Sequence, residues 1–260
     1  MYSVIRIFND KRKLFLIIII VSVMLFDIFY KIKNIPVGGM PYNANLSVFL
    51  AFTGIGPNFH ALVFWMLPIS LLFIVSDDIF EDFSTGNDIV QITKIGKKKY
   101  IKTMLIKGFT ISFAIIFVSL MINLIVSHIL LYGVTKTFES DLFKFGSLAE
   151  VCLRKPLLTN IVFIFVASIL SGTIGMTGSS MALAFGDRKK VYIASFLIWY
   201  IFFIPRKSIM LSIQPFSEYN LSDILPVYIA CIATHILVTI VCVIWRTKND
   251  DLSYKNQIVD

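Results

Sequence analysis

Apolar residues in this chain gather in six runs that are separated by short polar segments. A helix needs about 20 predominantly apolar residues to cross a bilayer. Five runs are long enough to be clear or probable spans, and the fifth in chain order is short. The runs are Leu14–Tyr30, Ala61–Val75, Phe109–Tyr132, Thr159–Phe185, Val191–Ile204 and Leu225–Trp245. We therefore predict an all-α membrane protein with six transmembrane helices, forming a single transmembrane domain over residues 1–260.

The composition supports the same class of protein. Hydrophobic residues make up 57% and charged residues 15% of the chain, and the mean hydropathy is +0.81. Soluble domains average about 45–50% apolar and about 25% charged residues, so a single aqueous core is excluded. The first run is too long for a removable signal peptide and has no small-residue cleavage site, so we expect it to be retained. The three cysteines have neither disulfide nor zinc spacing, and we expect no metal site.

The net charge of +8 follows from where the lysines and arginines lie. If the N-terminus is cytoplasmic, 16 of the 24 lie on cytoplasmic segments, which satisfies the positive-inside rule. This bias predicts that both termini are cytoplasmic and that the number of spans is even. It also accounts for the basicity without a nucleic-acid partner.

Three segments outside the spans have expected roles. Residues 1–13 have an amphipathic pattern that predicts an interfacial helix on the membrane surface, or else a frayed tail. The stretch between Pro205 and Pro226 is more consistent with two short half-inserted (re-entrant) helices between spans five and six than with a free loop. Residues 246–260 are expected to form a cytoplasmic tail. Pro68 predicts a kink in the middle of span two.

Small residues line one face of the fourth span. Ser171, Gly175 and Ser179 recur at steps of four, which places them on one side of a helix where another backbone can approach closely. Packing within the chain is the favoured interpretation, and a subunit interface or a substrate path remain alternatives.

Residues 76–108, between spans two and three, are the most charged part of the chain. An acidic half is followed by Gly86, by apolar residues at steps of three, and by a lysine-rich start to span three. This pattern predicts a cytoplasmic element with a short helix, which presents acids and lysines to the cytosol and passes force to two spans. The alternative is a solvated loop that obeys the positive-inside rule.

This segment resembles the coupling helix of permeases in type-2 ATP-binding-cassette (ABC) exporters. The likeness rests on an acidic residue, a Thr-Gly pair, an apolar run and a Lys-Tyr pair before the next span. It extends to the order of elements along the whole chain, from the interfacial helix through the six spans to the re-entrant helices between spans five and six. By this resemblance the coupling role falls on Glu81, Asp82, Gly86, Lys99, Tyr100 and Lys107. The acids Asp77, Asp78 and Asp88 depart from the pattern of the family and leave the charge of the partner-facing surface open.

The resemblance implies partners and a cargo. These are cytosolic ABC ATPase subunits carrying ATP and Mg, a second permease copy, and the lipid of a bacterial cell membrane. The cargo would be hydrophobic or amphipathic, and the short, Lys-, Ile- and Asn-rich chain is similar to permeases for bacteriocin or lantibiotic immunity and peptide export. The chain has no phosphate-binding loop of its own, so ATP hydrolysis is expected from the partner.

No catalytic motif appears in the sequence. His60, His128 and His235 lie on separate segments, and we expect them to be interfacial or packed. Asp27 is the only acid within a predicted span, and Lys31 follows one turn later, which predicts an interfacial ion pair. A non-transport membrane protein, either an intramembrane enzyme or a signalling partner, is the alternative function. A secondary transporter is disfavoured because intramembrane charges are scarce and no inverted repeat is evident.

Overall fold

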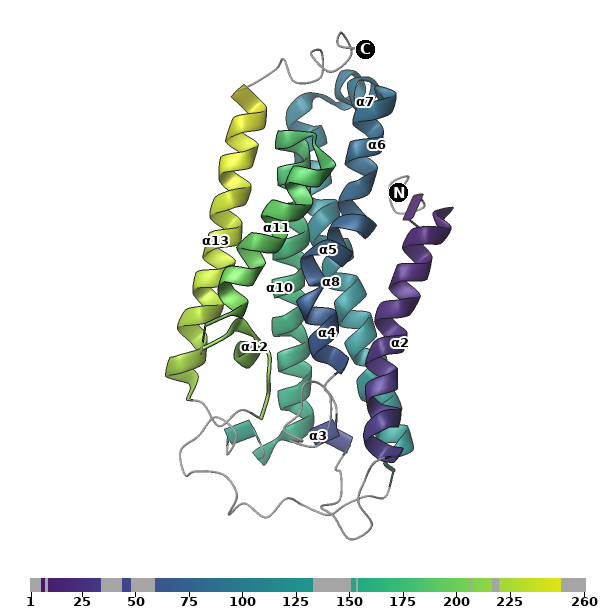
Figure 1. Cartoon of the computed structure of the whole chain (residues 1–260), viewed down its shortest axis with the longest axis vertical. Helices are drawn as coiled ribbons and strands as arrows, with labels where there is room; N and C mark the ends of the chain where they lie inside the picture. The colour runs from purple at the N-terminus through teal and green to yellow at the C-terminus, as the bar shows by residue number, and fades with distance from the viewer. Residues whose placement is uncertain are drawn as a thin grey trace.

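The computed structural model describes residues 6–7, 9–33, 44–47, 59–132, 151–152, 154–205, 207–216 and 220–248, and all regular structure in them is helical. Four helices are long and apolar enough to cross a membrane: α2 (Lys11–Lys33), α8 (Lys97–Leu130), α10 (Pro156–Phe185) and α13 (Leu221–Lys248). They run lengthwise through an elongated bundle (Figure 1). We call its two ends the α7 end and the α3 end, after the short helices located there. The all-α prediction is confirmed for the described residues.

The second predicted span is a broken helix. It starts as α4 (Phe59–Trp65), bends by 62°, and continues as α5 (Leu67–Leu71), a π-helical turn η1 (Leu72–Ser76) and α6 (Asp77–Thr85). The expected kink at Pro68 is confirmed, since Pro68 lies at the start of α5, where its missing N–H costs least. If the two parts form one span, the described helices provide five.

The helix of the second span does not end where residues 76–108 begin. Leu67–Thr85 runs without a break through Ser76, so the acidic half of residues 76–108 continues the helix of span two. The short helix that was predicted next is present as α7 (Asn87–Ile95). As expected, α8 starts directly after Gly96 and runs into span three as one 34-residue helix.

The remaining elements are shorter. The fifth apolar run forms α11 (Arg188–Phe203), whose 16 residues span about 24 Å at 1.5 Å per residue, less than a bilayer core of about 30 Å. Of the two predicted half-inserted helices, the described residues contain α12 (Ile209–Ser212), and α13 begins at Leu221 with Pro226 inside its first turns. α3 (Ala44–Ser47) lies at the end of the bundle opposite α7 (Figure 1). Residues 1–5 and 8 of the predicted interfacial helix, and residues 249–260 of the predicted tail, lie outside the described residues.

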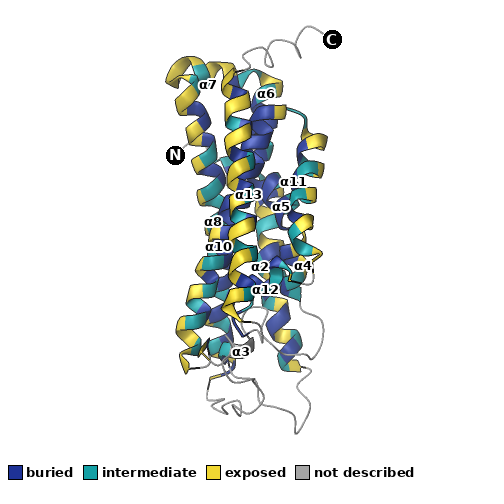
Figure 2. Cartoon of the chain, turned by 90° about the vertical axis from the view of Figure 1, so that its left-hand side faces the viewer, coloured by how far each residue is buried: buried dark blue, intermediate teal, exposed yellow. Residues whose placement is uncertain are grey.

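The centre of the bundle is the contact between α8 and α10. A Cβ added at Gly175 would lie 1.9 Å from Ser112 Oγ and 2.6 Å from Gly108 O, and one at Gly108 would lie 2.8 Å from Gly175 O. The backbones therefore meet at a distance that only glycine permits. Figure 2 shows buried residues turned toward the interior and exposed residues along the outer faces of the long helices. Many of these exposed residues are large and apolar, such as Phe15, Ile125 and Leu237, as expected for surfaces that face lipid.

Candidate functional site

Two of the four acids of α6 face the inside of the bundle. Asp78 and Asp82, four residues apart on one helix face, are only 1% and 2% exposed. The π-helical turn η1 directly precedes them, and such a turn adds a residue to the helical turn and rotates the next residues about the helix axis. We predicted that this segment would present its acids to the cytosol. That prediction is wrong for Asp78, Asp82 and Asp88, which are all buried.

Asp78 joins three helices through two lysines. Lys13 of α2 donates from Nζ to Oδ1 of Asp78, and Lys107 of α8 donates from Nζ to Oδ2 at 2.6 Å. Both lysines are almost fully buried, at 2% and 7% exposure. Each carboxylate oxygen thus holds a separate cation, and the loss of this one carboxylate would leave two buried ammonium groups without a counter-charge.

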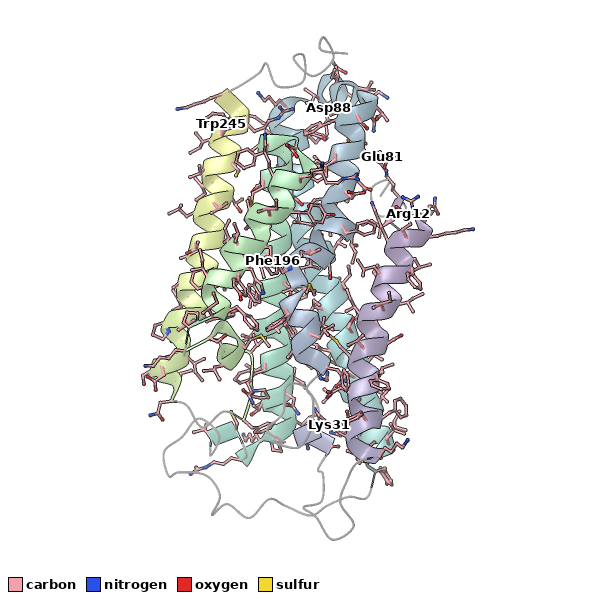
Figure 3. The ribbon with its side chains drawn as sticks, in the orientation of Figure 1. Arg12, Lys31, Glu81, Asp88, Phe196 and Trp245 are labelled. Atoms are coloured by element: carbon pink, nitrogen blue, oxygen red, sulfur yellow. The ribbon has the colours of Figure 1, made fainter. Side chains whose placement is uncertain are left out.

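Arg6 extends this cluster to the segment before α2. Its Nη1 donates to Asp82 at 2.6 Å and its Nη2 donates to Glu81 at 2.8 Å. Burial disfavours the charge of Arg6, but the bonds to Asp82 and Glu81 and the nearby Asp78 outweigh that effect and raise its pKa. Glu81 is the exposed member and faces the N-terminal segment (Figure 3).

We call these six residues the ion cluster: Arg6, Lys13, Asp78, Glu81, Asp82 and Lys107. Three cations face three carboxylates, so the cluster is electrically neutral. A buried charge is tolerated only when it is paired and hydrogen-bonded, and here the partners come from three separate parts of the chain. The cluster therefore fixes how α2, α6 and α8 meet at the α7 end.

A second group of charges holds α7 against α13. Arg246 near the end of α13 lies 3.9 Å from Asp88 of α7 and packs over the ring of Phe83 at 5.2 Å. Tyr100 is 1% exposed, and its hydroxyl has no hydrogen-bond partner among the described residues. These contacts place Asp88 and Tyr100 inside the α7 end and away from solvent.

The exposed surface at this end is formed by α7 itself. Ile89, Val90 and Ile95 are 36%, 48% and 40% exposed, while Ile92 packs inward against the core. Glycines with positive φ flank the helix: Gly86 at +69° and Gly96 at +82°. Because L-residues with side chains rarely adopt such angles, these glycines allow the chain to turn sharply from α6 into α7 and from α7 into α8. Lys94, Lys98 and Lys99 are exposed nearby.

The structure separates the residues to which the resemblance assigned a coupling role. Asp82, Tyr100 and Lys107 are buried, Gly86 forms the turn, and only Glu81 and Lys99 are exposed. The sequence reasoning missed Arg6, Lys13 and the central role of Asp78. A signal for Asp78 was present, because Asp78 and Asp82 share a helix face, but the chain gives no local indication of cations 65 and 29 residues away.

The small residues of α10 lie in packed contacts. Gly175 meets the backbone of α8, Ser179 Oγ lies 3.2 Å from Ser76 Oγ, and Ser171 Oγ donates to the carbonyl of Ala167 in its own helix. All three residues are buried. The contacts of Gly175 and Ser179 are thus with α8 and with the helix of the second span.

The comparisons with known proteins give a relative but no activity. No family model matches the chain, and no solved structure matches it. The chain is similar to an uncharacterized protein, YybM, of Bacillus subtilis (strain 168), with 29% identity over 248 residues that cover 95% of this chain and 97% of that protein. The similarity thus extends over nearly the full length of both chains, and the name of the relative assigns it no function.

Proposed function

We propose that this chain is the membrane subunit of an ATP-driven ABC exporter in a bacterial cell membrane. In this proposal six spans, with the bent second span and α11 included, place both termini in the cytoplasm. Two permease copies would work with two cytosolic ATPase subunits that bind ATP and Mg. The cargo is a hydrophobic or amphipathic molecule, such as an antimicrobial peptide that is exported or removed for self-immunity.

The observation that carries the proposal is the position of α7 between two continuous helices. Leu67–Thr85 leads into α7 through Gly86, and α8 leaves it through Gly96 as a single 34-residue helix. Figure 1 shows α7 at the extreme end of the bundle. Because a helix is stiff along its axis, a push on α7 would move both of these long elements together. A short exposed helix that is joined at both ends to long helices is suited to receive force from a soluble partner.

The structure changes which residues we assign to the contact. Asp82, Tyr100 and Lys107 cannot touch a partner while they are buried, so we assign them to holding the α7 end together. The partner surface is the exposed face of Ile89 and Val90 with the rim of lysines beside it. An apolar centre with a polar rim is the usual composition of a protein interface. The matching ATPase cleft would be apolar at its floor and acidic at its edge.

The charge distribution supports the proposed orientation. The lysines and arginines at the start of α2, around α7, at the start of α11 and at the end of α13 all lie at the α7 end. In bacterial membranes such an excess marks the cytoplasmic side. The α7 end is therefore the side on which a cytosolic ATPase could reach the chain.

The test is purification of the chain from its native membrane in mild detergent, with mass spectrometry and stoichiometry of the proteins that come with it. We expect an ATPase with a phosphate-binding loop at one copy per membrane chain. Val90→Asp should abolish its recovery because a carboxylate in an apolar contact costs several kcal/mol when buried. Thr103→Asp, at an exposed site of α8, is the matched control and should leave recovery unchanged. Recovery of the chain alone would favour the non-transport alternative.

A further inference from the structure

A groove with a volume of about 330 Å³ lies between α2 and α8. This volume falls within the range of about 300–1,000 Å³ that is usual for ligand sites. Ile17 and Val21 of α2 form one wall, and residues of α8 between positions 110 and 119 form the other. Ala114 and Val118 in the α8 wall are exposed. The groove therefore opens on the outer surface of the bundle, which faces lipid in a membrane.

The lining of the groove is suited to a hydrocarbon chain. Its two hydroxyls are engaged within α8, where Thr110 Oγ1 donates to the carbonyl of Ile106 at 2.8 Å and Ser119 Oγ donates to the carbonyl of Ile115 at 2.6 Å. Neither hydroxyl has a hydrogen left to donate into the groove. The remaining lining side chains, among them Ile7 of the segment before α2, are aliphatic. Because a buried water needs two to four polar partners, the matching ligand is apolar.

The groove has the depth of one lipid leaflet. It begins next to the ion cluster, because Lys107 lies one turn before Thr110 in α8 and Lys13 lies one turn before Ile17 in α2. From Thr110 to Ser119 the α8 wall is about 14 Å long at 1.5 Å per residue. Half of a bilayer core of about 30 Å has nearly the same length. The groove therefore matches an acyl chain that extends into the membrane from the α7 end.

Exposed cations surround the end of the groove where a headgroup would lie. They start α2 and α8 at the α7 end, where Figure 3 labels Arg12, and they are Lys11, Arg12, Lys98, Lys99 and Lys102. Among the described residues at these two helix starts the acid is Asp10, whose Oδ1 accepts from the backbone N–H of Arg12. The excess of positive charge is complementary to an anionic headgroup. Each basic residue near an anionic lipid surface gains about fivefold in binding.

We propose that this groove binds one anionic phospholipid of the surrounding membrane. One acyl chain lies in the groove between α2 and α8, and the headgroup phosphate lies among the cations at the α7 end. The acyl chain contacts both helices and fills the space beside the ion cluster, so the bound lipid stabilises the packing of α2 on α8. The site is independent of the proposed transport function, because its ligand is a lipid of the membrane and not a transported cargo.

Native mass spectrometry of the full-length chain in mild detergent tests the site. The purified chain is freed of lipid and then mixed with equal amounts of phosphatidylglycerol and phosphatidylcholine that have the same acyl chains. We expect one phospholipid to be retained per chain, with phosphatidylglycerol favoured by at least about fivefold because it is anionic. Since a ligand that binds the folded state stabilises it, phosphatidylglycerol should also raise the unfolding midpoint more than phosphatidylcholine does.

Variants separate this site from general coating of the bundle by lipid. Ala114→Trp fills the groove from its exposed mouth and should lose the retained lipid, whereas Ala230→Trp, the same change at an exposed position of α13, should keep it. If Ala114→Trp lowers the unfolding midpoint of the lipid-free chain, the smaller Ala114→Leu replaces it.

The charge of the headgroup is tested separately. The triple variant Lys11→Gln/Arg12→Gln/Lys102→Gln leaves the groove intact and should lose the preference for phosphatidylglycerol. Equal retention of phosphatidylglycerol by the natural chain and the folded Ala114 variant would overturn the proposal. Equal retention of the two lipids by the natural chain would overturn it as well.

Discussion

Asp78→Asn tests whether the ion cluster is the main interaction that stabilises the packing of helices at the α7 end. The substitution keeps the size of the side chain but removes its charge. An amide has one accepting oxygen in place of two, and its NH2 group repels the second lysine. Lys13 and Lys107 would then be two buried cations without a counter-charge, and Asp78 is only 1% exposed, so water cannot compensate for the loss in the native packing.

The expected cost is large for a single substitution. Removal of one partner from a buried ion pair costs about 3–5 kcal/mol, and two cations lose their partner here, so we expect the upper part of that range, about 4–5 kcal/mol. Total stabilities are about 5–15 kcal/mol. Asp78→Asn should therefore remove a major fraction of the free energy of unfolding.

The assay is thermal or denaturant unfolding of the purified chain in detergent, with Glu81→Gln as the matched control. Glu81 lies on the same helix, loses the same charge, and bonds to Arg6 at 2.8 Å, but its side chain is 59% exposed. Exposed pairs contribute about 0–1 kcal/mol. In Asp78→Asn/Lys107→Met, which removes one of the stranded cations, part of the stability should return. Equal, small effects of Asp78→Asn and Glu81→Gln would refute the reasoning.

Three further predictions concern helix contacts and caps. Gly175→Ala should cost about 2–3 kcal/mol because its Cβ meets the backbone oxygen of Gly108 at 2.6 Å. In Gly178→Ala the close contact of the Cβ is with the flexible side chain of Leu72, so stability should change by less than about 1 kcal/mol. Unfolding midpoints of the two variants that coincide would contradict this reasoning. Gly86→Ala should lower the free energy of unfolding by about 1–2 kcal/mol because alanine is strained at the positive φ of this position. It should also weaken recovery of the ATPase if α7 is the docking helix. An unchanged unfolding midpoint would contradict the assignment of Gly86 to a turn that requires glycine. Asp187 accepts from the backbone N–H groups of Lys190 and Lys189, and these bonds, that of Lys190 foremost, lower its pKa. Because the folded pKa is the lower one, the cap's contribution is complete above the ordinary value of 3.8 and is lost as pH falls through the lowered value. Amide protection at the start of α11 should fall in that acidic range, and Asp187→Asn, which caps without titrating, should remove the fall.

Local sequence signals predicted the local features of this fold well. Pro68 marked the bend, Gly86 and the apolar spacing after it marked α7, and the lysine-rich start of span three marked the beginning of α8. The spacing of Asp27 and Lys31 was enough to predict their ion pair. Each of these features depends on residues within one or two helical turns, where the geometry of the helix fixes which side chains meet.

The burial of the acids could not be predicted in the same way. Aspartate is usually exposed, and a run of acids next to a run of lysines is expected to be solvated. Here that tendency is overridden because Arg6, Lys13 and Lys107 arrive from other elements, and because the π-helical turn η1 orients α6. Neither the distant pairing nor the π-helical turn leaves a periodic signal in the sequence. The same tertiary contacts turned three of the residues assigned to a partner surface into internal ones.

The separation of the exposed face of α7 from the ion cluster allows docking and transmission to be tested independently. Val90 is 48% exposed and makes no charged contact, so Val90→Asp should abolish binding of a partner without lowering the unfolding midpoint. Glu81→Gln loosens the hold on Arg6 at the edge of the cluster and leaves α7 unchanged. If the cluster transmits force from α7 to α2, Glu81→Gln should still recover the ATPase, but cargo transport per ATP hydrolysed should fall. If cargo transport per ATP hydrolysed is unchanged in Glu81→Gln and in Arg6→Gln, the cluster only stabilises the contacts between helices. The force then passes through α6 and α8 alone.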